Sequence, residues 1–221
     1  VTIELSTVTN RVTINYWNGS YSIGYVNQSQ IVLPTQANMK AMGYMKPGYN
    51  LSGWTDISDD ETVPVYAPGT QITVTGDTEF WPVWTLAQYS ITYNMNGGDL
   101  PAPAGNPDGF DINDAEFNLV LPSRTGYGPG HWELSDGTQI SKINPQTYPR
   151  DLVLNAVWGT PNTYTVTFMD GSTAIGTSNV TYGSKYSILP VLSGDAYYSF
   201  SGWSLNTDGS DRVTGATIVK K

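Results

Sequence analysis

The sequence predicts a mainly β (α+β) protein of small repeat domains set in tandem in an extended array. Three observations carry the strand prediction: a composition that favours strands, alternating segments that end in turn dipeptides, and one cassette of motifs that occurs three times. Aromatic residues make up 12% and charged residues 13% of the 221 residues, while 23 Gly and 14 Pro repeatedly interrupt any helical apolar stripe. Thr, Tyr, Trp, Val and Ile suit a pleated, half-buried surface, so we expect strands throughout.

Each copy of the cassette opens with an alternating strand that ends in a turn. The three segments are VTINYWNG at 12–19, YSITYNMNGG at 89–98 and YTVTFMDG at 164–171. Alternation places Val12, Ile14 and Tyr16 on an inner face. Their counterparts are Tyr89, Ile91 and Tyr93, then Tyr164, Val166 and Phe168. The Asn-Gly and Asp-Gly dipeptides predict type I′ turns, in which both central residues have positive φ.

Two further elements follow in every copy. A strand runs into Leu-Pro at 31–34, 119–122 and 187–190, where proline removes a ladder donor and pairing should stop. An aromatic residue then precedes a Trp by five positions, and this Trp is Trp54, Trp132 or Trp203. We expect these three residues, together with Trp84 and Trp158, to anchor small cores, because a unit of about 70 residues needs large side chains to close its interior.

A closing strand completes the first two copies. It reads TEFWPVW at 78–84 and LVLNAVW at 152–158, and the third copy has too few residues after Gly215 for an equivalent. We therefore expect the third repeat to be incomplete and the natural polypeptide to continue past Lys221. The predicted divisions are an N-terminal strand or linker at 1–10, repeat 1 at 11–85, repeat 2 at 89–158 and the incomplete repeat 3 at 163–221. One short helix is predicted in the first copy, with Thr35 as N-cap and Gly43 as the stop.

The order of these motifs resembles the Listeria–Bacteroides repeat, the B-repeat of internalin-type bacterial surface proteins. The second copy is the most similar, through YSITYNMNGG, LVLPSRTGY and NAVW, although His131 stands where a glycine precedes Trp in the other two copies. The resemblance implies a small β-grasp-like fold, tandem arrangement on secreted cell-surface proteins, and a stalk or adhesive role without catalytic residues. The third copy is also similar to mucin-binding repeats through its YTVTF opening and TYGSKY stretch.

Charge and composition exclude several classes of function. The net charge is −9 with basic residues scattered singly, which gives no electrostatic footprint for nucleic acid. The absence of cysteine excludes disulfides, thiolate metal sites and a cysteine nucleophile. No apolar run is long enough to span a bilayer, and the first residues lack the pattern of a signal peptide. We expect a soluble fragment without membrane insertion.

Exposed aromatic side chains are the predicted ligand-binding residues. Trp81 lies in the closing strand on the face opposite Trp84, so alternation predicts that it points outward, where it could contact another repeat or stack on a sugar. Trp17, just before the first turn, raises the same alternatives, with shielding of its own hairpin as the structural one. Tyr21 and Tyr25, with Tyr44 and Tyr66, are extra tyrosines of the first copy that could form an adhesive patch.

Catalytic and metal sites are not predicted. The single histidine, His131, precedes a core Trp, and no nucleophile elbow is present. The acidic runs at 59–61 and 111–116 lie in loop-like stretches, where solvated charge is the ordinary outcome. The calcium candidates among the loop carboxylates are Asp111, Asp114, Asp208 and Asp211, but their spacing does not follow the pattern that directs ligands to one ion. We predict no cofactor and no metal.

The sequence therefore predicts a non-catalytic fragment of an extracellular adhesin or stalk on the bacterial cell surface. Its tandem repeats would display a binding region and make weak multivalent contacts with a protein or glycan on a host or neighbouring cell. The alternative is a carbohydrate- or mucin-binding array that uses exposed aromatic residues, and an enzyme built on the acidic loops is the third hypothesis. The ligand and the oligomeric state are not determined by the sequence.

Overall fold

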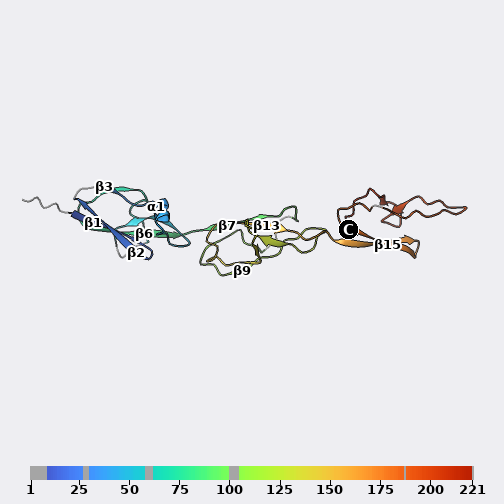
Figure 1. Cartoon of the computed structure of the whole chain (residues 1–221), viewed down its shortest axis with the longest axis horizontal. Coiled ribbons are helices and arrows are strands. Elements are labelled where there is room, and N and C mark those ends of the chain that lie inside the picture. Colours follow the sequence, from blue (N-terminus) through green and yellow to red (C-terminus); the bar gives the residue numbers. More distant parts are fainter. Residues whose placement is uncertain (1–8, 27–29, 58–61, 100–104, 187, 221) are drawn as a thin grey trace, which may run out of the picture. The chain divides into compact units, whose positions relative to one another are not determined.

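The computed structural model describes residues 9–26, 30–57, 62–99, 105–186 and 188–220, and leaves the side chains of residues 9, 10 and 23–26 undescribed. The protein is mainly β, with several small sheets, as predicted (Figure 1). Two compact units divide the chain. The first contains Val1–Ile91, Pro107–Phe117 and Ile143–Leu152, and the second contains Thr92–Asn106, Asn118–Lys142 and Val153–Lys221. Most of the predicted N-terminal strand or linker lies outside the described residues.

Four strands of the first copy form a mixed sheet in the order β2-β1-β6-β4 (Figure 1). They are β1 (Thr9–Tyr16), β2 (Gly19–Val26), β4 (Tyr49–Thr55) and β6 (Thr78–Leu86). β1 pairs antiparallel with β2 and parallel with β6, and β6 pairs antiparallel with β4. A separate antiparallel pair joins β3 (Gln30–Val32) to β5 (Gln71–Thr73). The hairpin, the helix that follows it and the parallel central strands agree with the β-grasp-like expectation.

The helix of the first copy begins and ends where the sequence predicts. Helix α1 (Gln36–Ala41) has Thr35 as its N-cap, whose side chain accepts a hydrogen bond from the backbone N–H of Asn38. The Asn38 side chain accepts one from the Thr35 backbone in return, which completes a capping box. Gly43 follows with a φ of 76° and ends the helix. Met39 is fully buried and joins the helix to the sheet.

The core of the first copy lies on the face that alternation predicted. Val12 and Ile14 of β1 are buried, and Tyr16 packs against them at the edge of the cluster. Leu33, from the Leu-Pro segment, and Trp54, from β4, are fully buried in the same cluster. The recurring motifs of the sequence therefore meet in one interior.

The turns differ from the sequence prediction in two of the three copies. The first hairpin loop consists of Trp17 and Asn18, because Tyr16 pairs with Gly19, and neither Asn18 nor Gly19 has positive φ. A Cβ at position 19 would lie 2.8 Å from the Tyr16 hydroxyl oxygen, so any other residue there would displace the Tyr16 ring. At the hairpin turn of the third copy, Gly171 has positive φ, at 57°, and the preceding Asp170 does not.

The second copy confirms the prediction at its turn. Asn96 has a φ of 46° and Gly97 has a φ of 77°, as a type I′ turn requires.

The second copy builds a five-stranded sheet in the order β11-β10-β13-β7-β8. Its strands are β7 (Tyr89–Asn94), β8 (Gly109–Phe110), β10 (His131–Glu133), β11 (Gln139–Ile140) and β13 (Leu152–Val157). A small sheet pairs β9 (Phe117–Asn118) with β12 (Lys142–Ile143). The closing strand β13 lies between the opening strand β7 and the Trp-bearing strand β10, as β6 lies between β1 and β4 in the first copy.

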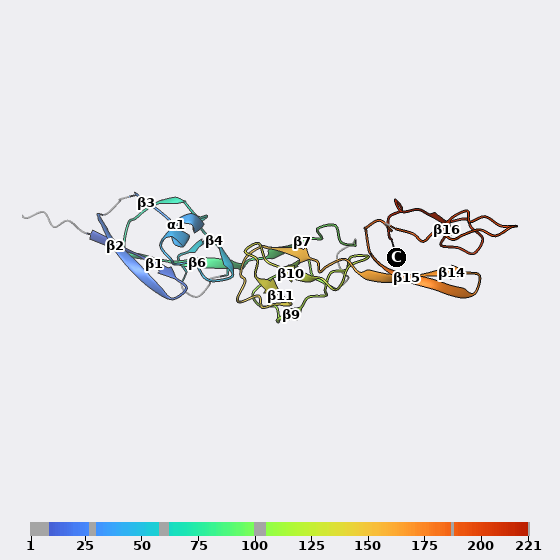
Figure 2. The same ribbon diagram turned by 45° about the vertical axis from the view of Figure 1, so that its right-hand side comes forward.

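The third copy has a different arrangement of strands. Its opening strand β14 (Thr163–Asp170) pairs with β15 (Thr173–Thr181), and its Trp-bearing strand β16 (Trp203–Ser204) pairs with β17 (Arg212–Val213) (Figure 2). These are two separate two-stranded sheets. In the described part of the third copy, no strand joins β14 to β16.

Candidate functional site

The most regular feature of the molecule is a hydrogen bond between a core indole and a backbone carbonyl. Trp54 donates its Nε1–H to the carbonyl of Pro34 at 2.9 Å, Trp132 to that of Val120 at 2.9 Å, and Trp203 to that of Pro190 at 2.7 Å. All three acceptors belong to the Leu-Pro segments that the sequence predicted to end their ladders. Because a carbonyl released from strand pairing can still accept, each segment satisfies the indole donor that burial would otherwise leave unpaired.

The five repeated Trp residues differ in burial. Trp54 and Trp132 are fully buried, which confirms the prediction that they anchor cores. Trp203 is half-buried and packs against Phe168 and Phe200, with ring centroids 5.0 and 5.4 Å away. Trp84 is half-buried and packs at the margin of the first core. The third copy therefore leaves its core indole more accessible than the other two copies do.

Trp158 explains the second glycine of the NGG motif. Its indole Nε1–H donates to the Asn96 carbonyl at 3.2 Å, so the closing strand is tied to the turn of the opening strand. The benzene ring of Trp158 lies where a side chain on Gly98 would project, and a Cβ on Gly130 would lie 2.7 Å from the same ring. The sequence analysis did not predict this packing. The available signal was that the NGG motif, which contains Gly98, and the Trp that ends the closing strand occur in the same copy.

Trp17 is exposed, as predicted, at the tip of the first hairpin. Its side chain is 49% exposed, and the side chain of Met169, which occupies the matching position in the third copy, is 45% exposed. The second copy has Met95 at this position, and its side chain is buried. Two of the three matched positions therefore expose an apolar side chain, Trp17 in a hairpin loop and Met169 in the paired part of its hairpin.

Trp81 is half-buried and lies between the buried Phe80 and Pro82, so alternation holds at this position. Strict alternation fails along β6, where Pro82 and Val83 are both buried. The failure begins at Val83, opposite an irregular register between Leu51 and Gly53 of the partner strand β4, whereas Trp81 pairs in register with Thr55. A bulge of this kind changes which side chains face the core.

Three extra tyrosines of the first copy, Tyr21, Tyr44 and Tyr66, are partly buried and pack against the margin of its core. The ring of Tyr44 stacks on Tyr16 at 4.0 Å and lies 5.8 Å from Tyr21. Tyr66 donates its hydroxyl to Asp56 at 2.9 Å, and this hydrogen bond raises the pKa of the Tyr66 hydroxyl above its ordinary value. The side chain of Tyr25 lies outside the described residues.

The loop carboxylates hold turns. Asp111 accepts a hydrogen bond from the backbone N–H of Asn113 and another from the Gln88 side chain, while Asp114 accepts from the backbone of Asp111. Asp208 accepts from the backbone and hydroxyl of Ser210, which lowers the pKa of its carboxyl, and Asp211 accepts from Asn206. Across the described residues, no group of three or more His, Asp and Glu side chains is arranged to hold a metal ion.

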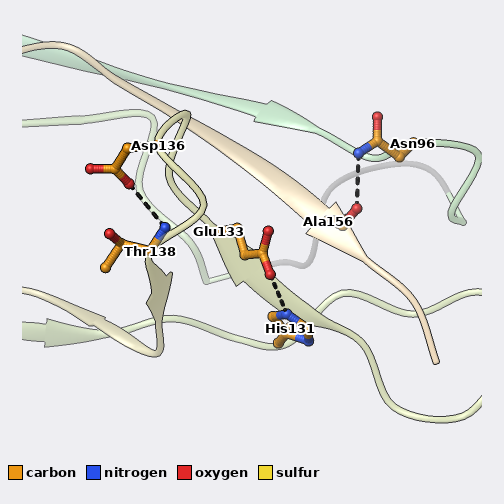
Figure 3. A network of polar contacts seen from close by, with 6 residues as sticks. All are labelled: Asn96, His131, Glu133, Asp136, Thr138 and Ala156. Atoms are coloured by element: carbon orange, nitrogen blue, oxygen red, sulfur yellow. Dashed lines mark hydrogen bonds and ion pairs between the residues drawn. The ribbon is translucent and has the colours of Figure 1, made fainter.

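His131 lies on β10 in a local pair with Glu133 (Figure 3). The His131 Nε2 and Glu133 Oε1 atoms are 2.9 Å apart, and both side chains are about one-third exposed, at 32% and 30%. They project from the face of β10 opposite the buried Trp132, since side chains two residues apart share a face of a strand. Neighbouring contacts in Figure 3 join Asp136 to the Thr138 backbone and Asn96 to the Ala156 carbonyl. These contacts hold β10 and its neighbouring turns in place. The contact drawn for His131 is with a carboxylate and not with a hydroxyl group.

Two exposed carboxylates make the loops sensitive to acid. Asp99 accepts hydrogen bonds from the backbone N–H and the hydroxyl of Thr125, and the backbone bond is the main reason that its pKa is lowered. Asp195 accepts from the backbone N–H groups of Tyr197 and Tyr198, which lowers its pKa in the same way. A pKa lowered by folding stabilises the folded state above the ordinary value of 3.8, and this contribution is lost as the pH falls through the folded pKa.

We therefore expect the Asp99→Asn variant to show faster amide exchange than the native protein at Thr125 near neutral pH. The difference should shrink below the ordinary carboxyl pKa, because the native side chain is then protonated as well. Hydrogen exchange at several pH values measures this loop directly. A difference that stays constant through the acid range would contradict the assigned role of the Asp99 charge.

The comparisons with known proteins bear on the last copy first. Residues 164–221 match the family model of the Listeria-Bacteroides repeat domain. This repeat is typical of bacterial surface proteins and is not typically catalytic, and no catalytic family was found. The family predicted from the motif order is thereby confirmed for this segment.

A longer match covers most of the chain. It is 24% identical over 179 residues to a protein of Evansella cellulosilytica named "Putative Gly-rich membrane protein", and it covers 80% of this chain. The chain spans about a fifth of that relative, since the match covers 19% of its length. No solved structure matches the chain. Within the described residues, every helix is too short or too polar to cross a bilayer.

Proposed function

We propose that this chain is a non-catalytic segment of a bacterial cell-surface protein, whose repeats display a binding region and make weak multivalent adhesive contacts. The observation that supports this most strongly is the indole-to-carbonyl bond that recurs at Trp54, Trp132 and Trp203. It shows that the large aromatic side chains are used to stabilise small interiors one after another. A segment made in this way provides repeated, similar surfaces.

Two further findings agree with the proposal. The match of residues 164–221 is to a repeat typical of bacterial surface proteins, and the relative from Evansella cellulosilytica is named as a membrane protein. The imidazole of His131, the single histidine, is paired with the carboxylate of Glu133 two residues away. Linked copies gain avidity by raising effective concentration without any single strong site.

Beads that carry the full chain at graded densities provide the test on mucin-coated surfaces and on epithelial cell layers. We expect retention to rise more steeply than linearly with density, while the soluble monomeric chain competes weakly. Beads coated to the same density with chemically unfolded chain serve as the control. Retention that is absent at every density, or that is fully blocked by low concentrations of monomeric chain, would contradict a weak multivalent role.

Exposure of Trp17 favours carbohydrate stacking as a second candidate function. An indole that is 49% exposed at a hairpin tip can lie against the apolar face of a sugar ring at little structural cost. Its neighbours in the loop are polar, since Asn18 follows it. This arrangement combines an aromatic platform with hydrogen-bonding groups.

Trp17→Ala should reduce retention on mucin-coated surfaces severalfold if the indole contacts the glycan. Val32→Ala is the control, because it removes an exposed apolar side chain from β3 of the same copy, away from the hairpin loop. Both variants should unfold at nearly the native temperature, since neither side chain is in a core. Equal retention of the Trp17→Ala variant and the native chain would remove this residue from the binding surface.

A further inference from the structure

A cleft of about 570 Å³ lies in the third copy, between its opening strand and its Trp-bearing strand. One wall consists of consecutive residues of β14, from Val166 to Asp170. Side chains alternate between the two faces of a strand, so this continuous run is the pattern expected of a cleft that runs along the strand edge. The opposite wall includes Trp203 and Ser204 of β16. The cleft therefore follows the main-chain edge of β14 that β15 does not occupy.

In the other two copies the equivalent position is occupied by the closing strand. β6 lies between β1 and β4, and β13 lies between β7 and β10. β14 corresponds to β1 and β7 by sequence, and β16 carries the Trp that corresponds to those of β4 and β10. The third copy thus presents the two walls of a strand position whose occupant is seen twice elsewhere in the molecule.

The registers of the first two copies define what such an occupant looks like. In the first copy, Ile14 pairs in parallel with Phe80, and Trp54 pairs with Pro82. In the second copy, Trp132 pairs with Ala156. The residue opposite the core Trp is therefore small in both, a large apolar residue comes two positions before it, and a Trp comes two positions after it.

We propose that the cleft between β14 and β16 is a strand-binding site for an extended closing strand of the same repeat type, supplied from outside the described residues of this copy. The strand runs parallel to β14 and antiparallel to β16. Its large apolar side chain faces Val166, and its small residue faces Trp203. Its main chain satisfies the open edge of β14, which is the physical basis of recognition by strand addition.

The charge of the cleft further restricts the occupant. Asp170 is the charged side chain of the lining, and it lies at the end of β14 toward which the terminal Trp of a parallel strand would extend. A basic residue directly after that Trp is therefore favoured over an acidic one. The half-buried Trp203 and Phe168 provide the apolar surface that the strand would cover.

A labelled peptide with the sequence LVLNAVW, followed by Lys, is the probe, and the full chain is its partner in a fluorescence anisotropy titration. Three matched peptides test the geometry without changing the protein: a scrambled sequence, a version with Trp in place of the small Ala, and a version with N-methyl groups on alternate amides. We expect each to bind about tenfold more weakly or worse, because each removes the apolar pattern, the fit against Trp203 or the main-chain donors. Exchanging the terminal Lys for Glu should also weaken binding.

Amide exchange in the full chain locates the bound peptide. Exchange should slow along β14, while β1 should be unaffected because its corresponding edge already pairs with β6. Equal binding of the N-methylated or scrambled peptide would overturn the proposal. So would protection of the outer amides of β14 before any peptide is added. This inference does not depend on adhesion, so negative bead retention together with sequence-specific peptide binding would reject the proposed function alone.

Discussion

Trp54→Ala is expected to destabilise the first copy by about 3–5 kcal/mol, the range measured when a buried aromatic side chain is truncated in a core. Trp54 is fully buried, and it also closes the segment between Pro34 and β4 through its indole hydrogen bond. Removal of the ring creates a cavity beside Leu33 and Met39, which are themselves fully buried. Segment-resolved hydrogen exchange in a denaturant series measures the free energy of opening for residues 9–86.

Two control variants separate packing from hydrogen bonding. Trp54→Phe keeps an aromatic ring but leaves the buried Pro34 carbonyl without its donor, so about 1–3 kcal/mol should be lost. Trp203→Ala should cost clearly less than Trp54→Ala, because the indole of Trp203 is only half-buried. If the Trp203 and Trp54 truncations cost the same, the assignment of Trp54 as the deeper anchor would be wrong.

Gly98→Ala is expected to destabilise the second copy by about 1–3 kcal/mol, the usual cost of overpacking. The new methyl group would overlap carbons of the Trp158 ring and would lie 2.9 Å from the Ser123 carbonyl oxygen. The backbone oxygen cannot move aside as a flexible side chain would. Gly128→Ala is the matched control in the same copy, because a Cβ there has no atom within 4 Å.

A double-mutant cycle tests the cause of that loss. In a Trp158→Ala background the ring is absent, so Gly98→Ala should cost less than it does in the native protein. The remaining cost reports the contact with Ser123. Urea unfolding of the four proteins, followed by exchange at residues 89–157, gives the coupling free energy. Simple additivity would show that the ring does not require glycine at position 98.

The sequence predicted those parts of the fold that depend on local pattern. Alternation placed Val12 and Ile14 inside, and the capping residues defined helix α1 between Thr35 and Gly43. The recurring Trp residues predicted where the interiors form, and two of them, Trp54 and Trp132, are fully buried. These features follow from residue type and spacing alone, because the pleat and the helix each have a fixed period.

Long-range contacts determine what the sequence did not predict. Pro82 and Val83 are both buried because the register of β4 shifts opposite Val83 and Trp84, and no local signal marks this shift. Glycine precedes Trp54 because the Tyr66 carbonyl approaches: a Cβ on Gly53 would lie 2.7 Å from that oxygen. In the second copy the same position holds His131, whose side chain instead reaches Glu133.

The cleft of the third copy was likewise beyond local prediction. The motifs could not show that a cleft of about 570 Å³ lies between the main chains of β14 and β16, beside the contact of Phe168 with Trp203. Phe168 becomes a candidate binding residue because the fold places it in the same cleft as Trp203, and this proximity is not visible in the sequence. Among the ligand-binding residues predicted from the sequence, Trp17 is exposed, while Trp81 and Tyr21 are half-buried.

Each core indole donates to a main-chain carbonyl, and this allows the chain between donor and acceptor to vary in length from copy to copy. The donor and acceptor residues are 20 positions apart in the first copy, 12 in the second and 13 in the third. A carbonyl is present at every residue, so the intervening chain can lengthen without any compensating change of side chain. In the first copy this interval, from Pro34 to Trp54, contains helix α1. The corresponding interval of the other copies is therefore a suitable place to insert foreign peptides.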